Sequence, residues 1–486
     1  RYKIGAYCAC EDTWIYTDNQ ADNFSEGTHY SIWFNDVQLP EWSKKAKVYQ
    51  IFVDRFNPGV GKEWLQKSDL QKPFGGTLRG IIEKLDYISA LGFDALWLTP
   101  IFESPSHHGY DISDYYKINP RFGTKADFDD LIEKAHIKGI RIILDFVANH
   151  CSDQNELFLD ARSSLNSQYH DWFIWNQWPD DYKSFFNVKE MPEFNLAYGQ
   201  PARKYLLECA QYWLGQGVDG FRLDYAHGPE QDFWVDFRQT CRQEAPQCWT
   251  FGELVQPALE ISSYEGGLDG SLDFHLCRAL RLTFAQKSWP LSRLAGMLKS
   301  HWDYFGQDFS LPAFIDNHDM NRFLIPANGD ERYLKIALMF LYFLSAPPVV
   351  YYGTEIGLSQ NKSIHSTGGL GFDEARLPMD WNVTSELSAY IARLAELRRK
   401  HPVIFERKEK IVRCDDERQT LVMSSGEGKQ RLWLLVNRSE LSRNIKLENL
   451  DVNALRDGIN DKKIKVKNCS LSIELEPVSS IWLIPG

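Results

Sequence analysis

Short runs of apolar residues alternate along the chain with longer stretches in which apolar positions recur every three or four residues. Uninterrupted apolar runs are typical of strands buried on both faces, and the longer stretches are typical of amphipathic helices that cover a sheet. The expected strands lie at residues 48–52, 95–98, 141–145, 220–224, 249–253, 270–274, 313–316 and 349–352. The clearest helical stretches lie between them, at residues 78–91, 125–138, 202–214 and 331–344. Eight strand–helix repeats of this kind predict an α/β fold, a (β/α)8 TIM barrel.

Several segments depart from this alternation. Residues 150–197 follow the third expected strand and hold a cluster of Tyr, Trp and Phe, so we expect an inserted subdomain (domain B) whose aromatic residues mostly pack its own core. From residue 396 to 486, β patterns follow one another without helices, which predicts a C-terminal antiparallel β-sandwich domain. Residues 1–43 fit neither pattern and are expected to be an N-terminal extension or the remnant of an N-terminal domain. We expect residues 44–149 and 198–395 to form the catalytic barrel.

Charge and hydropathy narrow the range of partners. The 486 residues include 66 acidic and 54 basic side chains, a formal net charge of −12, which argues against nucleic acid and against an anionic membrane surface as partners. The longest stretch without charge, residues 336–352, contains Pro347 and Pro348 and is too short to span a bilayer. We therefore expect no membrane span, and a buried helix leading into a buried strand. The oligomeric state stays open.

Cysteine usage bears on the compartment. The nine cysteines are odd in number and include no Cys-x-x-Cys pair, which disfavours zinc and redox sites. Scattered structural thiols favour a cytoplasmic location, with a secreted or periplasmic location left open. Aromatic residues make up 14% of the chain. Because sugar-binding clefts use aromatic faces, this composition favours a carbohydrate ligand.

Polar side chains gather where the expected strands end. The active site of a (β/α)8 barrel lies at the carboxyl ends of its strands, where the βα loops begin. In the fourth strand, Arg222 and Asp224 are two positions apart and therefore point to the same side. With the other strand ends, one Arg, two His and three carboxylates come to the same rim: Arg222, His150, His318, Asp224, Glu253 and Asp319. A convergence of this size predicts a catalytic cleft rather than a structural ion-pair network.

Four of these strand ends, in order, resemble the signature regions of the α-amylase family of glycoside hydrolases. They are Asp-Phe-Val-Ala-Asn-His at 145–150, Gly-Phe-Arg-Leu-Asp at 220–224, Gly-Glu at 252–253 and Asp-Asn-His-Asp at 316–319. Three more segments resemble motifs of the same family, at 108–111, 191–195 and 351–356. The segment at 191–195 and the region 25–56 look closest to the neopullulanase, cyclomaltodextrinase and intermediate subfamilies.

The resemblance implies a retaining glycoside hydrolase that cleaves α-glucosidic bonds, mainly α-1,4, in starch-derived glucans or malto-oligosaccharides. Asp224 would be the nucleophile that carries the covalent glycosyl-enzyme, with Arg222 keeping it ionised and oriented. Glu253 would act as the general acid and then as the general base. Asp319 would hold substrate hydroxyls and favour the distorted, oxocarbenium-like ring.

The same resemblance implies further residues that bind the reacting sugar. His150 and His318 would hydrogen-bond it. Tyr110 would stack on it, and Arg322 would contact it. His227 stands three residues after the nucleophile, where relatives place Lys or Asn, so it either lines the sites beyond the scissile bond or packs against the helix that begins near residue 229. This departure, and the absence of a Trp directly after the acid, leave a preference for cyclodextrins or pullulan open.

The resemblance also bears on cofactors and on alternatives. A structural calcium ion is common in the family and Asn149 matches one of its usual ligand positions, whereas no organic cofactor is implied. A glucan transferase on the same scaffold would share all three carboxylates and is the main alternative to a hydrolase. A non-catalytic amylase-like binding module would have lost them. The expected partner is an α-glucan or oligosaccharide substrate.

Overall fold

The computed structural model describes residues 3–16, 21–23, 38–66, 68–306, 308–366, 371–406 and 409–486. The chain divides into two compact units, Arg1–Gln38 and Leu39–Gly486. In the first unit, β1 (Gly5–Cys8) and β2 (Thr13–Tyr16) pair as an antiparallel hairpin. The helices and the other described strands belong to the second unit.

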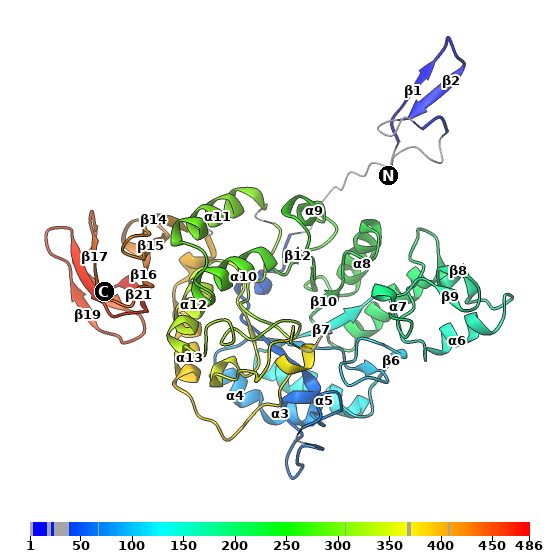
Figure 1. Ribbon diagram of the computed structural model, residues 1–486, viewed down its shortest axis with the longest axis horizontal. Coiled ribbons are helices and arrows are strands. Elements are labelled where there is room, and N and C mark those ends of the chain that lie inside the picture. Colours follow the sequence, from blue (N-terminus) through cyan, green and yellow to red (C-terminus); the bar gives the residue numbers. More distant parts are fainter. Residues whose placement is uncertain are drawn as a thin grey trace. The chain divides into compact units, whose positions relative to one another are not determined.

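Parallel strands form the centre of the second unit, as the apolar runs predict (Figure 1). They pair in the order β12-β11-β10-β7-β4-β3-β13. Their bounds are β3 (Val48–Ile51), β4 (Ala95–Leu98), β7 (Arg141–Val147), β10 (Gly220–Asp224), β11 (Trp249–Gly252), β12 (Gly270–Ser271) and β13 (Val349–Tyr351). Apart from the first residue of β7, every residue of these strands is buried, which explains why the runs are apolar and not alternating.

The sheet closes on itself at residues 310–313, where the seventh strand of the barrel was predicted to begin. The backbone N–H of Ser271 donates to Ser310 O at 3.0 Å, and that of Val349 donates to Ala313 O at 2.7 Å. The regular strand predicted over 313–316 is not formed, and the pairing reduces to isolated bridges at Ser310 and Ala313. Pro312 lies between them and has no N–H to donate to a ladder. The (β/α)8 barrel is confirmed, and its seventh strand position pairs with its neighbours through isolated bridges.

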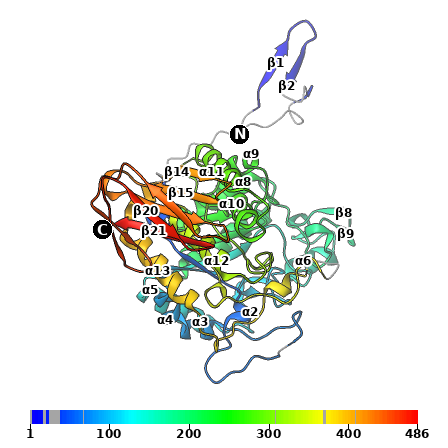
Figure 2. The ribbon, with the colours of Figure 1, turned by 60° about the vertical axis from the view of Figure 1, so that its left-hand side comes forward.

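Helices surround the barrel sheet (Figures 1 and 2). They are α1 (Glu41–Lys45), α2 (Val53–Phe56), α3 (Leu78–Glu83), α4 (Leu85–Ala90), α5 (Lys125–Ile137), α7 (Pro201–Gly215), α8 (Gln231–Glu244), α9 (Ala258–Ser262), α10 (Phe274–Leu280), α11 (Leu291–Tyr304), α12 (Glu331–Phe343) and α13 (Glu386–Lys400). The helix predicted over 78–91 is split at Lys84, whose N–H donates to Ile81 O in a tightened turn. None of the described helices is long and apolar enough to cross a membrane.

The loop after β7 carries the inserted segment, which lies beside α7 in Figure 1. It contains α6 (Glu156–Ser163) and a short antiparallel pair, β8 (Trp175–Gln177) and β9 (Asp181–Tyr182). The ring of Phe158 lies 4.9 Å from that of Phe173 and 4.9 Å from that of Tyr182. These rings form a small aromatic core within the segment. A second short pair, β5 (Phe102–Glu103) and β6 (Asp114–Ile118), forms in the loop after β4.

The C-terminal part is an antiparallel sheet in the order β14-β15-β16-β21-β18-β19, with β17 and β20 paired beside it. The strands are β14 (Lys410–Asp415), β15 (Thr420–Ser425), β16 (Leu432–Asn437), β17 (Arg443–Leu447), β18 (Ala454–Asp457), β19 (Lys463–Lys465), β20 (Leu471–Leu475) and β21 (Ser479–Pro485). The ring of Trp482 in β21 lies 5.3 Å from that of Phe343 at the end of α12. This contact ties the C-terminal sheet to a helix of the barrel.

Candidate active site

Three neighbouring strand ends meet at the guanidinium of Arg222 in β10. This strand pairs in parallel with β7 and β11, in a register that places Arg222 beside Asp145 and Phe251. Nη1 of Arg222 donates to Oδ1 of Asp145 at 2.7 Å and to Oδ1 of Asp224 at 2.8 Å. Its Nη2 lies 2.8 Å from Oε2 of Glu253. One buried guanidinium therefore holds three carboxylates together.

A second cation, Arg376, holds Asp319. Nη2 of Arg376 donates to Oδ1 of Asp319 at 2.7 Å, and Nε2 of His318 lies 2.8 Å from Oδ2. Nε2 of Gln50 lies 2.7 Å from Nδ1 of His318. Both oxygens of Asp319 are thus engaged and its orientation is defined.

Tyr110 connects these two groups. Its hydroxyl donates to Oδ2 of Asp145 at 3.0 Å and lies 2.5 Å from Nε2 of His318. The Tyr110 and His318 rings are parallel to within 2°, with centroids 5.5 Å apart. The indole N–H of Trp97 donates to the same oxygen of Asp145 at 3.0 Å. The predicted residues Tyr110 and His318 therefore lie together, next to the carboxylates.

Burial and charge shift two carboxyl pKa values in opposite directions. Burial and the neighbouring carboxylates raise the pKa of Asp224 well above its ordinary value, although Arg222 acts to lower it. The pKa of Asp319 is lowered, because the combined attraction of His318 and Arg376 outweighs the effect of burial. Burial is the largest cause for Asp224, and Arg222, which contacts three carboxylates, acts in the opposite direction. That Arg222 keeps Asp224 ionised during catalysis stays a prediction.

His150 lies at the end of β7 with its ring stacked on Phe185, the centroids 4.4 Å apart. The side chain is fully buried, and burial lowers its pKa to about 3, so the ring is neutral near pH 7. Its Nε2 has no hydrogen-bond partner among the described residues. An unpaired buried polar atom is costly unless a ligand completes it. His150 is therefore a neutral hydrogen-bonding group that is available to a substrate hydroxyl.

Arg322 is buried and bonded to the backbone. It donates to Tyr352 O at 2.8 Å and to Ala375 O at 3.1 Å, and its guanidinium lies 4.3 Å from the centroid of the Tyr351 ring. These bonds brace the residue next to Arg376. The predicted contact of Arg322 with substrate stays a prediction.

His227 is exposed in the loop between β10 and α8. Its neighbour Gly228 lies so close to the Asn149 side chain that a Cβ at Gly228 would overlap Oδ1 of Asn149. This packing explains why Gly follows His227. The role of His227 in substrate placement stays a prediction.

The structure leaves the predicted calcium ligand Asn149 a prediction. Calcium takes six to eight oxygen ligands, which include backbone and Asn carbonyl oxygens as well as carboxylates. Within the described ranges, no three His, Cys, Asp or Glu side chains gather in a way that could hold a metal ion. Asn149 packs against Gly228, and its Nδ2 lies 3.4 Å from Nδ1 of His150.

Three further side chains of the site were not predicted from the sequence: Gln50, Trp97 and Arg376. Gln50 is a polar residue inside the apolar run of β3. Because a buried amide needs a hydrogen-bond partner, its place in that run indicates a contact with another polar side chain. Trp97 carries an N–H that needs an acceptor when the ring is buried. Arg376 lies in the loop between β13 and α13, where no periodic pattern marks it. Only its contact with Asp319 reveals it.

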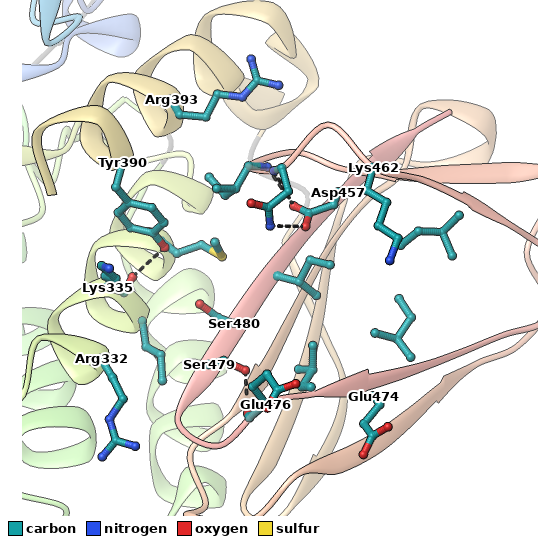
Figure 3. Close-up of a pocket in the computed structure, with 18 of the residues that line it drawn as sticks. Arg332, Lys335, Tyr390, Arg393, Asp457, Lys462, Glu474, Glu476, Ser479 and Ser480 are labelled. Carbon is teal, nitrogen blue, oxygen red and sulfur yellow. Dashed lines mark hydrogen bonds between the residues drawn. The ribbon is translucent and has the colours of Figure 1, made fainter. Parts of the chain in front are cut away.

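A groove of about 1180 Å³ lies elsewhere, between α12, α13 and the C-terminal strands (Figure 3). Its labelled side chains include Lys335 and Tyr390 from the two helices and Ser480 from β21. None of the residues that line it comes from the strand ends that carry the carboxylates. The groove is therefore separate from the carboxylate cluster at the rim of the barrel.

Known proteins resemble the chain over most of its length. A family model for the α-amylase catalytic domain matches residues 50–395. Alpha-amylase 2 of Dictyoglomus thermophilum is 36% identical over 436 residues, 87% of this chain and 76% of that protein. A cyclomaltodextrinase of Geobacillus thermopakistaniensis is 32% identical over 423 residues, 83% of this chain and 70% of that protein. The structure of an α-amylase from Geobacillus thermoleovorans, complexed with acarbose, superposes with a TM-score of 0.80 at 26% identity and covers 91% of this chain and 98% of its own.

Proposed function

Since the chain belongs to the α-amylase family of glycoside hydrolases, enzymes that act on α-glucans, we propose that it cleaves α-1,4-glucosidic bonds in starch-derived glucans and malto-oligosaccharides with retention of configuration. The observation that carries the proposal is the bridging of Asp224 and Glu253 by Arg222, with contacts of 2.8 Å to each. Retaining glycosidases place their two carboxyl groups about 5–5.5 Å apart, closer than inverting enzymes do. Two carboxylates on one guanidinium favour the closer spacing.

In this mechanism Asp224 attacks the anomeric carbon and the bond to the leaving oxygen breaks. Glu253 gives its proton to that oxygen, and a covalent glycosyl-enzyme forms on Asp224. Water then attacks the same carbon and returns its proton to Glu253, which regenerates Asp224 as a carboxylate. Arg222 stabilises the ionised form of whichever carboxylate bears the charge, because it contacts both.

Burial raises the pKa of Asp224 in the free site. Positive charge that develops at the anomeric carbon during the reaction favours the ionised form of Asp224. Glu253 contacts the same guanidinium and supplies the proton for the leaving oxygen in this proposal.

The remaining cleft residues bind the sugar in this proposal. Asp319 is kept ionised by His318 and Arg376 and accepts hydrogen bonds from sugar hydroxyls. Nε2 of His150 is free to pair with another hydroxyl. Tyr110 offers its ring face. The acarbose complex of the Geobacillus thermoleovorans α-amylase supports a pseudo-oligosaccharide or oligosaccharide as the ligand class.

We expect an intracellular location. All nine cysteines, from Cys8 to Cys469, are free thiols. Persistent free thiols are typical of reducing compartments, whereas secreted proteins tend to pair them. Fractionation of the source cells, with the protein followed by antibody, would check this proposal.

A product profile with stereochemical readout tests the function directly. The enzyme is incubated with maltotriose, soluble starch, pullulan and a cyclodextrin, and the first product of each is followed by proton NMR. We expect release of the α-anomer from maltotriose and starch. Appearance of the β-anomer first would overturn the retaining mechanism, and no release from any of these glucans would overturn the substrate class.

A further inference from the structure

Two thiols meet at the turn of the N-terminal hairpin, between β1 and β2 (Figure 1). Cys8 is the last residue of β1, and Cys10 lies in the turn that follows it. Their Sγ atoms are 2.7 Å apart. Both are free thiols, Cys8 partly exposed and Cys10 exposed. The sequence disfavours a redox site because it holds no Cys-x-x-Cys pair, whereas the structure brings together two accessible thiols with Cys-x-Cys spacing.

The hairpin holds this pair of thiols in place. Cys8 lies opposite Thr13 in the register of the two strands. Across the turn, the backbone N–H of Glu11 donates to Cys8 O at 3.3 Å, and the hydroxyl of Tyr7 donates to Oδ1 of Asp12. Because the backbone already brings the two sulfur atoms into contact, a bond between them requires only a small movement of two side chains.

The surroundings of Cys8 favour its thiolate. The pKa of the Cys8 thiol is lowered, because the Cys10 thiol and the backbone N–H groups of Cys10 and Glu11 donate to its sulfur. The thiolate is the form of cysteine that attacks a disulfide. Cysteines that sense oxidants are accessible, have a low pKa and lie next to a second cysteine that can displace the bound oxidant. Cys8 and Cys10 meet these three conditions.

We propose that Cys8 and Cys10 form a reversible dithiol–disulfide site that reacts with low-molecular-weight disulfides such as oxidised glutathione. The thiolate of Cys8 attacks one sulfur of the oxidant, the S–S bond of the oxidant breaks, and one thiolate leaves. Cys10 gives its proton to solvent and attacks the Cys8 sulfur of this mixed disulfide, and the second thiolate leaves. The protein has then lost two electrons, and the oxidant has been reduced to two thiols.

The short loop between the two residues makes this bond a labile one. A disulfide that closes so short a loop removes little conformational freedom from the unfolded chain and therefore adds little stability. Strained and exposed disulfides are the easily reduced, regulatory ones. We expect the bond to form under oxidising conditions and to open with reduced glutathione. This behaviour agrees with a chain whose nine cysteines are free thiols, because disulfides of reducing compartments are transient.

The test follows the two thiols by mass spectrometry. The reduced 486-residue chain is equilibrated with mixtures of reduced and oxidised glutathione and quenched with acid, and the remaining thiols are alkylated before digestion. The wild-type peptide that contains Cys8 and Cys10 should lose two hydrogen atoms and carry no glutathione, and dithiothreitol should restore both thiols. Cys10→Ser keeps a hydroxyl donor beside Cys8 but cannot displace the bound glutathione, so the mixed disulfide should accumulate on Cys8.

Cys469 is the matched control within the same chain. It is an exposed thiol, and residues 415–486 contain no second cysteine. Its reaction with oxidised glutathione should therefore stop at the mixed disulfide in the wild type and in Cys10→Ser alike. Cys8 of the Cys10→Ser variant should react about tenfold faster than Cys469 at neutral pH, because its thiolate is stabilised.

The wild-type chain decides the outcome without reliance on a variant. Glutathione retained on Cys8 at every ratio, with no internal disulfide, would overturn the proposal. Equal rates for Cys8 and Cys469 would overturn it as well. The result is independent of the proposed glycosidase function, since no residue of the cleft takes part. The same samples are assayed with maltotriose, and a chain that closes the disulfide but cleaves no glucan would refute that function and leave this inference standing.

Discussion

The guanidinium of Arg376 donates a hydrogen bond to Oδ1 of Asp319 at 2.7 Å, between residues 57 positions apart in the chain. Nε of the same side chain donates to the backbone O of His318 at 2.9 Å. The loop after β13 thereby holds the residues that follow the irregular seventh strand position of the barrel. Since residues 310–313 pair with their neighbours only through isolated bridges, the position of Asp319 depends on a side chain from another loop.

Replacement of Arg376 should therefore weaken substrate binding and alter its pH dependence. Arg376 and His318 together lower the pKa of Asp319. In Arg376→Met the pKa of Asp319 rises, so a higher pH is needed to ionise it, and the acidic limb of the kcat/KM profile moves to higher pH. We expect a loss in kcat/KM of about 10²-fold at neutral pH, from one charged hydrogen bond and the misplaced carboxylate.

Arg376→Lys is the matched variant for that experiment, because it keeps the charge and loses the fork of donors. Its acidic limb should stay close to that of the wild type while kcat/KM falls. An unmoved acidic limb in a folded Arg376→Met enzyme would contradict the role assigned to Arg376.

Asp224→Asn and Glu253→Gln should each abolish cleavage of maltotriose with the fold intact. Each removes a chemical role, and the expected loss in kcat is on the order of 10³-fold or more. The two variants should differ with α-glucosyl fluoride, whose leaving group needs no proton. Glu253→Gln is expected to retain the burst of fluoride release from glycosylation, and Asp224→Asn to lose it. Either variant with more than a tenth of wild-type kcat on maltotriose would refute the assignment.

Asp224→Asn should also make the protein more stable near neutral pH. Burial and nearby carboxylates raise the pKa of Asp224 in the folded state, so the folded protein pays a free-energy cost to hold the ionised form above that pKa. The amide removes this cost. We expect Tm to rise by about 1–5 °C above the folded pKa, and the difference to shrink as pH falls below it, where wild-type Asp224 is protonated. Scanning calorimetry over a series of pH values measures the difference; a shift that is the same at every pH would speak against this cause.

His227→Ala tests the loop after β10. If the exposed ring lines the sites beyond the scissile bond, this variant should raise KM for maltopentaose severalfold and shift the cleavage pattern towards other bonds. Turnover of an activated aryl glucoside should change little. Equal changes on both substrates, or none on either, would show that His227 only fills the loop.

The contact of Trp482 with Phe343 predicts that the C-terminal sheet supports the barrel. Trp482→Ala removes a fully buried indole and should lower the free energy of unfolding by about 3–5 kcal/mol. Denaturant melts followed by far-UV circular dichroism measure the loss. Trp14→Ala, at a side chain of the N-terminal hairpin that is 48% exposed, is the control and should leave the melt of the second unit unchanged.

The apolar runs and the polar residues at their ends were sufficient to predict the barrel and the gathering of Asp224, Glu253 and Asp319. A strand buried on both faces must be apolar throughout, and parallel strands bring their carboxyl ends to one rim, so local sequence determines both features. The order of the motifs likewise identified the family before any contact was known.

Only the tertiary structure showed how the site is held. Gln50 reaches His318 over 268 residues and Arg376 reaches Asp319 over 57, and no periodic pattern encodes such pairings, because loops place them through packing. The sharing of Arg222 among three carboxylates depends on distances of a few ångströms, and burial together with the neighbouring carboxylates raises the pKa of Asp224. Sequence determines which groups reach the rim, and the long-range contacts decide their charge, orientation and partners.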